Sequence, residues 1–179
     1  KYAASKISGE TSVKQEYSTV TILRPSIIFG EDDSFFNMFE KLSRFLPILP
    51  LIGGGHTKFQ PVYVRDIALA IANIIEANTP SDPEGNTYHI GGPTILSFKE
   101  VYQKLFKETN RKRFLIPLPW PIATAQARLM ELMPTPMLTR DQVESLKTDN
   151  IIKGDVLTLK DLNATPTNMD TILSTYLGK

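Results

Sequence analysis

Hydrophobic and polar positions come in short blocks along the chain, and these blocks predict helices that alternate with strands. Apolar spacing and capping residues predict helices over residues 2–17, 33–45, 64–78, 97–109, 121–132 and 139–147, with a last one starting near Thr167. Compact β-branched or apolar runs predict strands at 19–23 and 86–90, with extended pieces at 58–64 and 114–118. Because helices alternate with strands in the first half, we expect a parallel sheet there.

The strand pattern is too sparse for a complete domain. Only the runs at 19–23 and 86–90 predict strands strongly, and two strands do not form an independent α/β domain. The pattern therefore predicts a domain with pieces missing. The proline- and glycine-rich stretch 47–55 is expected to be a connection, with a flexible part at 53–55. The basic triplet 111–113 is expected to be a solvated turn between a helix and a strand.

Composition excludes several classes of site. Twenty basic residues stand against 19 acidic ones, a formal charge of +1, which argues against a nucleic-acid-binding face. The absence of cysteine excludes disulfides and thiolate ligands, and His56 and His89 lack the spacing of metal ligands. We expect no metal site. No apolar run reaches the length of a membrane-spanning helix, about 18 to 20 residues.

The first candidate for chemistry is the pair formed by Tyr2 and Lys6. Residues four apart share one face of a helix, and a nearby ammonium favours the phenolate form of tyrosine. Such a tyrosine can exchange a proton with a substrate alcohol or carbonyl. The same lysine can hydrogen-bond the ribose of a nucleotide. The alternative is an exposed lysine beside a half-buried tyrosine, with no chemical role.

Motifs further along the chain give the Tyr2–Lys6 spacing a context. A predicted buried strand leads into Leu23-Arg24-Pro25 and then Phe29-Gly30, and Pro61-Val62-Tyr63-Val64-Arg65-Asp66 opens a helix. This ordered set resembles the second half of an extended or atypical short-chain dehydrogenase/reductase, the family that includes NAD-dependent epimerases and dehydratases. Three further stretches, at 45–55, 139–150 and 159–177, are similar to the branch that contains the 39 kDa subunit of respiratory complex I.

The resemblance implies an α/β fold. The chain is expected to be the C-terminal part of a Rossmann-type NAD(P)-binding fold with a mostly helical substrate lobe. Residues 1–95 would form the end of the Rossmann-type domain, with a substrate-lobe insertion at about 31–62, and residues 96–179 the C-terminal substrate lobe and tail.

The resemblance also implies roles for particular residues. Tyr2 would be the proton donor or acceptor, and Lys6 would hold the nicotinamide ribose of NAD or NADP. The loop residues that approach the carboxamide would be Pro25, Ser26, Ile27 and Ile28. Amide and carbonyl groups of an irregular loop suit this contact when they remain free to pair. Gln60 and Tyr63 would line the substrate side. For Asp66 a charge at a helix N-terminus is preferred over a site role.

One feature of such enzymes is missing from the sequence. None of the ten glycines forms the Gly-rich turn that binds a dinucleotide pyrophosphate. We therefore expect the Gly-rich N-terminal half to lie outside this chain, and the isolated chain to be inactive. Apolar faces at Val20, Ile22, Ile71 and Ile75 are expected to be covered by that half or by another chain.

Three functions remain open. The first is the C-terminal part of an NAD(P)-dependent oxidoreductase or epimerase acting on a small-molecule substrate. The second is a nucleotide-binding accessory or assembly protein without turnover, which the resemblance to the complex I subunit allows; fold alone does not decide between them. In the third, residues 114–138, with Trp120 and three methionines, form a partner- or membrane-facing surface. For this segment, a helix packed on the substrate lobe is the preferred alternative. The expected location is the cytoplasm or an organelle matrix, peripheral to a membrane if bound to one.

Overall fold

The computed structural model describes residues 2–177, except for the side chains of Tyr2 and Ala3, and these residues form two compact units. Unit 1 contains the residues up to Phe29 together with Gln60–Thr94 and Ile151–Met169. Unit 2 contains Gly30–Phe59, Ile95–Asn150 and the residues from Asp170 onward. Each unit is thus assembled from three separate stretches of the chain. The expected insertion at 31–62 resembles the first stretch of unit 2, whereas residues 151–169 lie in unit 1 rather than in a C-terminal lobe.

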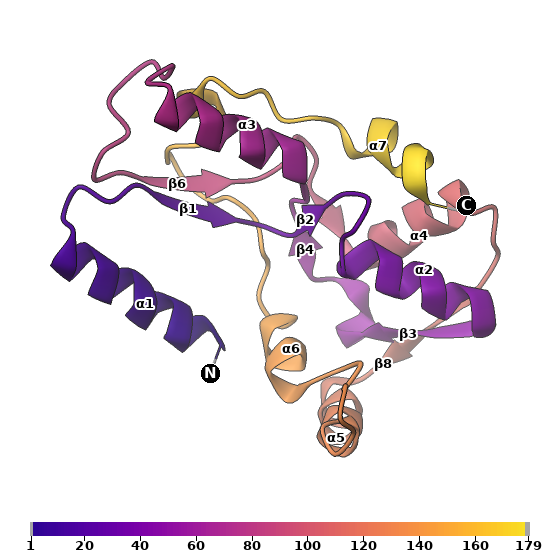
Figure 1. Cartoon of the computed structure of the whole chain (residues 1–179). Helices are drawn as coiled ribbons and strands as arrows, with labels where there is room; N and C mark the ends of the chain where they lie inside the picture. Colours follow the sequence, from indigo (N-terminus) through magenta and orange to yellow (C-terminus); the bar gives the residue numbers. More distant parts are fainter. Residues whose placement is uncertain (1, 178–179) are drawn as a thin grey trace. The chain divides into compact units, whose positions relative to one another are not determined.

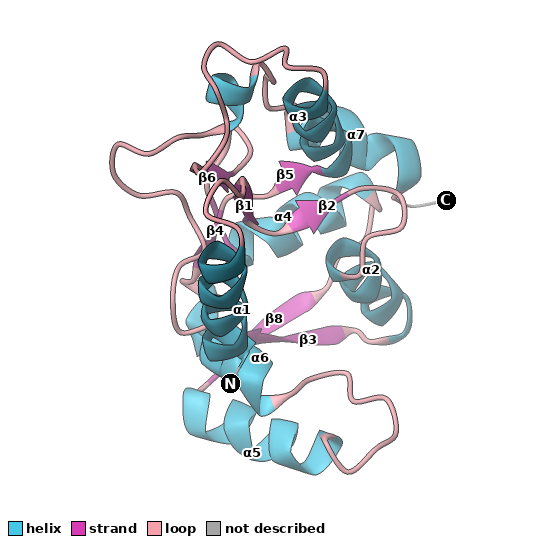
Figure 2. Ribbon diagram, turned by 60° about the vertical axis from the view of Figure 1, so that its left-hand side comes forward, coloured by secondary structure: helices cyan, strands magenta, loops and turns pink. Residues whose placement is uncertain are grey.

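Unit 1 is built around short parallel strand pairs. Its elements are α1 (Tyr2–Glu16), β1 (Ile22–Pro25), β2 (Ile28–Phe29), β5 (Val62–Tyr63), α3 (Val64–Ile75), β6 (Thr87–Ile90) and the 3-10 turn η2 (Leu159–Leu162). β1 pairs in parallel with β6, and β2 pairs in parallel with β5. Helices α1 and α3 lie on opposite sides of the β1–β6 pair (Figures 1 and 2). This layering confirms the expected α/β class with parallel pairing.

The core of unit 1 lies between α3 and β6. Buried apolar side chains from α3, β5, β6 and the 159–164 segment form one cluster, made of Val62, Ala70, Tyr88, Ile90, Leu159, Leu162 and Ala164. The buried side-chain amide of Asn73 donates to the carbonyls of Leu162 and Asn163, at 2.9 and 3.2 Å. These bonds hold the 159–164 segment on α3, and this is why residues far along the chain belong to unit 1.

Unit 2 is mostly helical. Its elements are α2 (Phe35–Phe45), β3 (Ile48–Ile52), the 3-10 turn η1 (Gly53–Gly55), β4 (Lys58–Phe59), β7 (Leu96–Ser97), α4 (Phe98–Glu108), β8 (Phe114–Leu118), α5 (Trp120–Met130), α6 (Arg140–Ser145) and, from Asp170, most of α7 (Met169–Tyr176). β3 and β8 run side by side in parallel (Figure 2), and β4 pairs antiparallel with β7. Ser97 caps α4 in a complete capping box with Glu100, as the sequence predicts.

Aromatic rings fill the centre of unit 2. Phe39 of α2 packs on Phe98 and Tyr102 of α4, with ring centroids 5.4 and 4.9 Å apart. Burial raises the pKa of the Tyr102 hydroxyl, which donates to the carbonyl of Pro50 at 3.3 Å. These contacts fix α2, α4 and β3 against one another.

Two stretches differ from the expectation. The expected connection at 47–55 contains β3, a five-residue strand that pairs fully with β8. Proline has no amide hydrogen to donate to a neighbouring strand, so it is tolerated in edge strands. Pro50 fits this rule because β3 and β8 form a two-stranded sheet, in which both strands are edge strands. The stretch 53–55 forms a left-handed turn that packs against neighbouring side chains. Gly53 has a φ of 60°, and a Cβ there would overlap the Trp120 ring at 2.0 Å.

Two absences concern residues 2–177. No helix in this range is both long and apolar enough to cross a membrane. No group of three or more histidine and carboxylate side chains in the same range is arranged to hold a metal ion.

Candidate functional site

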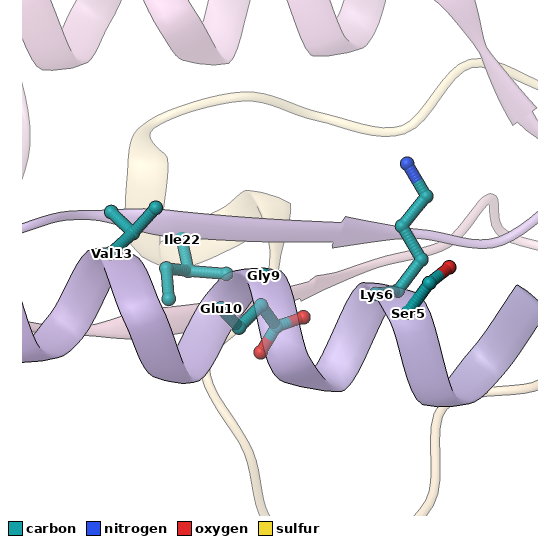
Figure 3. A pocket seen from close by; sticks show the side chains of 6 residues that line it. All are labelled: Ser5, Lys6, Gly9, Glu10, Val13 and Ile22. Carbon is teal, nitrogen blue, oxygen red and sulfur yellow. The ribbon is translucent and has the colours of Figure 1, made fainter.

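Helix α1 brings Lys6 to the carboxyl end of β1. The helix runs back alongside β1 in the opposite direction, so its first turns lie near the end of the strand (Figure 1). Figure 3 shows the Lys6 side chain standing over the arrowhead of that strand. Tyr2 is the first residue of α1, and its side chain lies outside the described part of the structure. Ligands of open parallel sheets bind at the carboxyl ends of the strands, so Lys6 is at the end where a nucleotide would bind.

A shallow pocket separates α1 from β1. Its volume is about 380 Å³, and it is lined by Ser5, Lys6, Gly9, Glu10, Val13 and Ile22 (Figure 3). Five of these six residues come from one face of the helix, and Ile22 comes from the strand. The pocket places one ammonium and one carboxylate beside an apolar wall.

Glu10 and Arg24 join the helix to the strand. The Arg24 Nε atom lies 3.1 and 3.0 Å from the two Glu10 carboxylate oxygens, and Nη2 lies 2.5 Å from Oε2. Hydrogen bonding to Arg24 lowers the pKa of Glu10 below its ordinary value, and the same bond raises the pKa of Arg24. Both groups are therefore charged at neutral pH. Glu10 lies one turn after Lys6, so the two side chains share a helix face.

The loop after β1 is more fully paired than its irregular sequence suggests. The Ser26 amide donates to the Ile90 carbonyl at 2.8 Å, and the Ile27 carbonyl accepts from the Val62 amide at 2.9 Å. Ile28 lies in β2, opposite Val62. The expectation that the amide and carbonyl groups of Pro25–Ile28 remain free is therefore wrong for these two groups, because parallel pairing resumes directly after β1. The carboxamide contact itself stays a prediction.

Gln60 ties this loop to two other segments. Its backbone amide donates to Ser26 Oγ at 3.3 Å, and its side-chain Nε2 donates to the Gly92 carbonyl at 2.8 Å. Its side-chain Oε1 accepts from the Ile152 amide at 3.0 Å. Both ends of the side-chain amide are thus used within unit 1, and Gln60 orders the carboxyl ends of the strands. Its assignment to the substrate side stays a prediction.

Tyr63 and Asp66 lie at the start of α3. Tyr63 is half-buried against Phe29, with ring centroids 5.6 Å apart. Asp66 is buried, and its carboxylate accepts from the Thr167 amide at 2.6 Å and from the Thr167 hydroxyl at 2.7 Å. Asp66 therefore anchors the 164–169 segment to α3, a structural role in line with the preference for a charge at a helix N-terminus.

Replacing Gln60 with methionine tests this ordering role. Methionine keeps the length of the side chain but neither hydrogen bond, so the Gly92 carbonyl and the Ile152 amide lose their partners. We expect unit 1 to lose about 2 kcal/mol. Hydrogen exchange of the amides in 26–28, 91–92 and 151–152 measures it, with Gln103→Met on the exposed face of α4 as the matched control. Equal protection in both variants would show that Gln60 does not order these loops.

The sequence pattern does not identify one residue of the site, Glu10. The Arg24-Pro25 pair is visible as part of a family motif, but nothing marks Glu10 as its partner. The only signal in the sequence is that Glu10 lies four residues after Lys6, on the same helix face. A charged residue at that position is usually exposed on a helix surface, so this spacing alone does not indicate an ion pair with a strand.

All of the predicted site residues lie in unit 1, at 2, 6, 25–28, 60 and 63. The arrangement defines a class of protein: a Rossmann-like α/β fold with a Tyr-x-x-x-Lys helix beside the carboxyl ends of parallel strands. The model of the RmlD substrate-binding domain family matches residues 1–149. The chain belongs to this family.

Curated relatives agree with the resemblance seen in the sequence. The chain is 33% identical over 171 residues to the mitochondrial NADH dehydrogenase [ubiquinone] 1 alpha subcomplex subunit 9 of Arabidopsis thaliana, covering 90% of this chain and 42% of that protein. It is 34% identical over 168 residues to the subunit of the same name in Rattus norvegicus, covering 93% and 44%. The chain therefore spans less than half the length of these relatives.

Solved structures show the same fold. A dTDP-glucose 4,6-dehydratase from Streptomyces venezuelae, with NAD bound, superimposes with a TM-score of 0.60 at 18% identity, covering 93% of this chain and 45% of that chain. A dTDP-4-dehydrorhamnose reductase from Bacillus anthracis, in complex with NADP, gives a TM-score of 0.63 at 21% identity, covering 98% and 53%. Identities this low show a shared fold and no more.

Proposed function

We propose that this chain supplies the nicotinamide and proton-transfer side of an NAD(P)-binding site. The observation that carries the proposal is the position of Lys6, one helical turn after Tyr2, at the carboxyl end of β1, the strand that ends at Pro25. An ammonium there suits the hydroxyls of a nicotinamide ribose. The residues fit that end of the cofactor alone, since no Gly-rich turn for the pyrophosphate occurs among the 179 residues.

The chemistry assigned to the chain is limited to its own residues. The cofactor, when bound, supplies hydride transfer. Lys6 holds the ribose, and its positive charge lies one helical turn from Tyr2. The Tyr2 hydroxyl then gives a proton to a substrate carbonyl, or takes one from an alcohol. Tyr63, the last residue of β5, would line the substrate side, and Gln60 would order the neighbouring loop through its bond to Ser26.

A second candidate is an accessory protein that binds the nucleotide without turnover. It is favoured by the relatives at 33–34% identity, whose names describe subunits of a mitochondrial NADH dehydrogenase. In that case its partners are other protein subunits, and it is located in an organelle as a peripheral part of a membrane complex. The small-molecule substrate of the first candidate would then be absent.

One experiment on the protein in its full natural length separates these candidates. We expect Lys6→Met to weaken NADH or NADPH binding about tenfold, the effect of losing one charge-assisted hydrogen bond. Tyr2→Phe should leave binding unchanged and slow turnover by about 10²- to 10⁴-fold if the protein is an enzyme. Binding is followed by nucleotide fluorescence, and turnover by NAD(P)H oxidation with carbonyls, sugar nucleotides and quinones.

The matched control is Lys99→Met, an exposed lysine on α4 of unit 2. Binding without turnover on any of these substrates would favour the accessory role. If Lys6→Met binds nucleotide as tightly as Lys99→Met does, the proposed site is refuted.

A further inference from the structure

Within this chain, helix α1 meets the rest of unit 1 mainly through polar side chains. Among its residues with described side chains, Glu10 alone is half-buried, and the others are exposed. Its apolar side chains are among the exposed ones, with Ile7 at 64% and Val13 at 47%. The shallow pocket between α1 and β1 lies where an apolar contact would otherwise be (Figure 3). The apolar surface that α1 buries against the other residues of this chain is therefore small.

Within this chain, polar contacts attach α1 to the strands. The Glu10 carboxylate accepts hydrogen bonds from both Nε and Nη2 of Arg24. This bidentate geometry fixes the orientation of the two side chains as well as their distance. Their side chains are 26% and 45% exposed, so water screens the pair only in part. Further along the helix, Lys14 Nζ donates to Thr87 Oγ1 of β6 at 3.1 Å. The Glu10–Arg24 and Lys14–Thr87 contacts therefore attach the helix to β1 and to β6, its neighbour in the sheet.

The position of this ion pair matters for the site. Arg24 is the next-to-last residue of β1, immediately before the loop at 25–28. Glu10 and Lys6 lie one turn apart on the same helix face. Anchoring Glu10 to Arg24 therefore sets how far the first turns of α1 reach beyond the end of β1, and so where the Lys6 ammonium stands.

We infer that Glu10 and Arg24 are positioning residues, whose ion pair docks α1 on β1 and thereby places Lys6 for a nicotinamide ribose. The second half of this inference rests on the proposed function, and the first half does not. The pair acts through Lys6 and does not touch the nucleotide.

The docking is tested on the 179-residue chain. Because the chain has no cysteine, nitroxide labels can be placed on Ser8→Cys of α1 and Glu84→Cys of the turn before β6 without any background labelling. We expect one narrow distance distribution. Glu10→Gln and Arg24→Gln should each broaden it, and their combination should broaden it no further. Amides of α1 should exchange about tenfold faster in each variant. Glu16→Gln, an exposed carboxylate on the same helix, is the control.

The placement of Lys6 is tested on the protein in its full natural length. We expect Glu10→Gln to weaken NADH binding by about fivefold when Lys6 is present, and to have no effect in a Lys6→Met background. A residue that only stabilises the fold would weaken binding in both backgrounds.

Each result has one meaning. Unchanged distance distributions in Glu10→Gln and Arg24→Gln overturn the docking role, whatever the nucleotide does. Equal losses of NADH affinity with and without Lys6 overturn the positioning role. If the parent protein binds no NADH or NADPH, the proposed function fails and the ribose half of the inference fails with it, while the distance distributions still decide the docking.

Discussion

Replacing Gly92 with alanine is expected to disrupt the strand ends of unit 1. An alanine Cβ at this position would lie 1.9 Å from the Pro61 carbonyl oxygen and 3.1 Å from its carbonyl carbon. Backbone cannot move aside as a flexible side chain can, so the segment around Gln60 and Pro61 must shift. That shift also breaks the bond from the Gly92 amide to the Gln60 carbonyl. We expect a loss of about 3 kcal/mol, at the upper end for an overpacked site.

Hydrogen exchange measures this effect where it arises. The amides of Ser26, Val62 and Gly92 should lose protection together, because their bonds cross the same junction. Gly9→Ala is the matched control, since a Cβ at Gly9 meets nothing within 4 Å. It should stabilise α1 by about 0.5 to 1 kcal/mol, because alanine favours a helix interior over glycine. Equal protection in Gly92→Ala and the parent would show that Pro61 does not approach the strand so closely.

The same junction shows what the sequence can and cannot predict. Helix α4 is predictable because its cap is local: Ser97 and Glu100 are three residues apart and bond each other's backbone. The close approach of Gly92 to Pro61 joins residues 31 positions apart, and no local pattern encodes it. A Gly-Gly pair after a strand predicts a turn. Only the structure shows that the second glycine is there to admit a carbonyl.

The candidate site likewise has features that the sequence predicts and features that it does not. The Tyr2–Lys6 spacing is visible because it lies within one helix. The partner of Arg24 is not, since Glu10 reaches it from a different element, and the occupied amide of Ser26 is hidden for the same reason. Strand β3 is not predictable from its residues because Pro50 indicates a strand breaker, although an edge position tolerates it. Residues 151–169 could not be placed in unit 1, because long-range bonds from Asn73 and Asp66 hold them there.

A buried carboxylate in unit 2 gives the second large effect. Glu40 of α2 is only 4% exposed. Its carboxylate accepts from Arg111 Nη1 at 2.6 Å and from Arg44 Nε at 2.8 Å. The expected solvated turn at 111–113 is therefore wrong for Arg111, whose side chain is 21% exposed and bound to Glu40. Glu40→Ala would leave the Arg111 guanidinium partly buried without its counter-charge, and we expect a loss of about 3 kcal/mol.

Arg44, the second partner of Glu40, supplies a control for the effect of burial. The Arg44 side chain is 45% exposed and pairs with Glu40 across one helical turn. Arg44→Ala should therefore lose only about 0.5 kcal/mol, as exposed ion pairs do. Trp120, the only tryptophan in the chain, lies in unit 2 and reports its unfolding by fluorescence in urea. Similar urea midpoints for Glu40→Ala and Arg44→Ala would mean that the buried charge contributes no more than an exposed one.

The direction of the Glu40 pKa shift predicts how its contribution to stability changes with pH. Burial alone would raise the pKa of Glu40, but hydrogen bonds and positive charge from Arg111 and Arg44 outweigh it and lower the pKa. A carboxyl with a lowered pKa in the folded state contributes its stability above the unfolded pKa of about 4.3 and loses it as the pH falls through the folded value. The urea midpoint of the parent should exceed that of Glu40→Gln by a constant amount from about pH 7 to 5, and the difference should shrink below about pH 4. A difference that persists undiminished at about pH 3 would show that the charge of Glu40 is not what holds Arg111 in place, since below about pH 4.3 the unfolded state takes up the proton first and the contribution of the charge must fall.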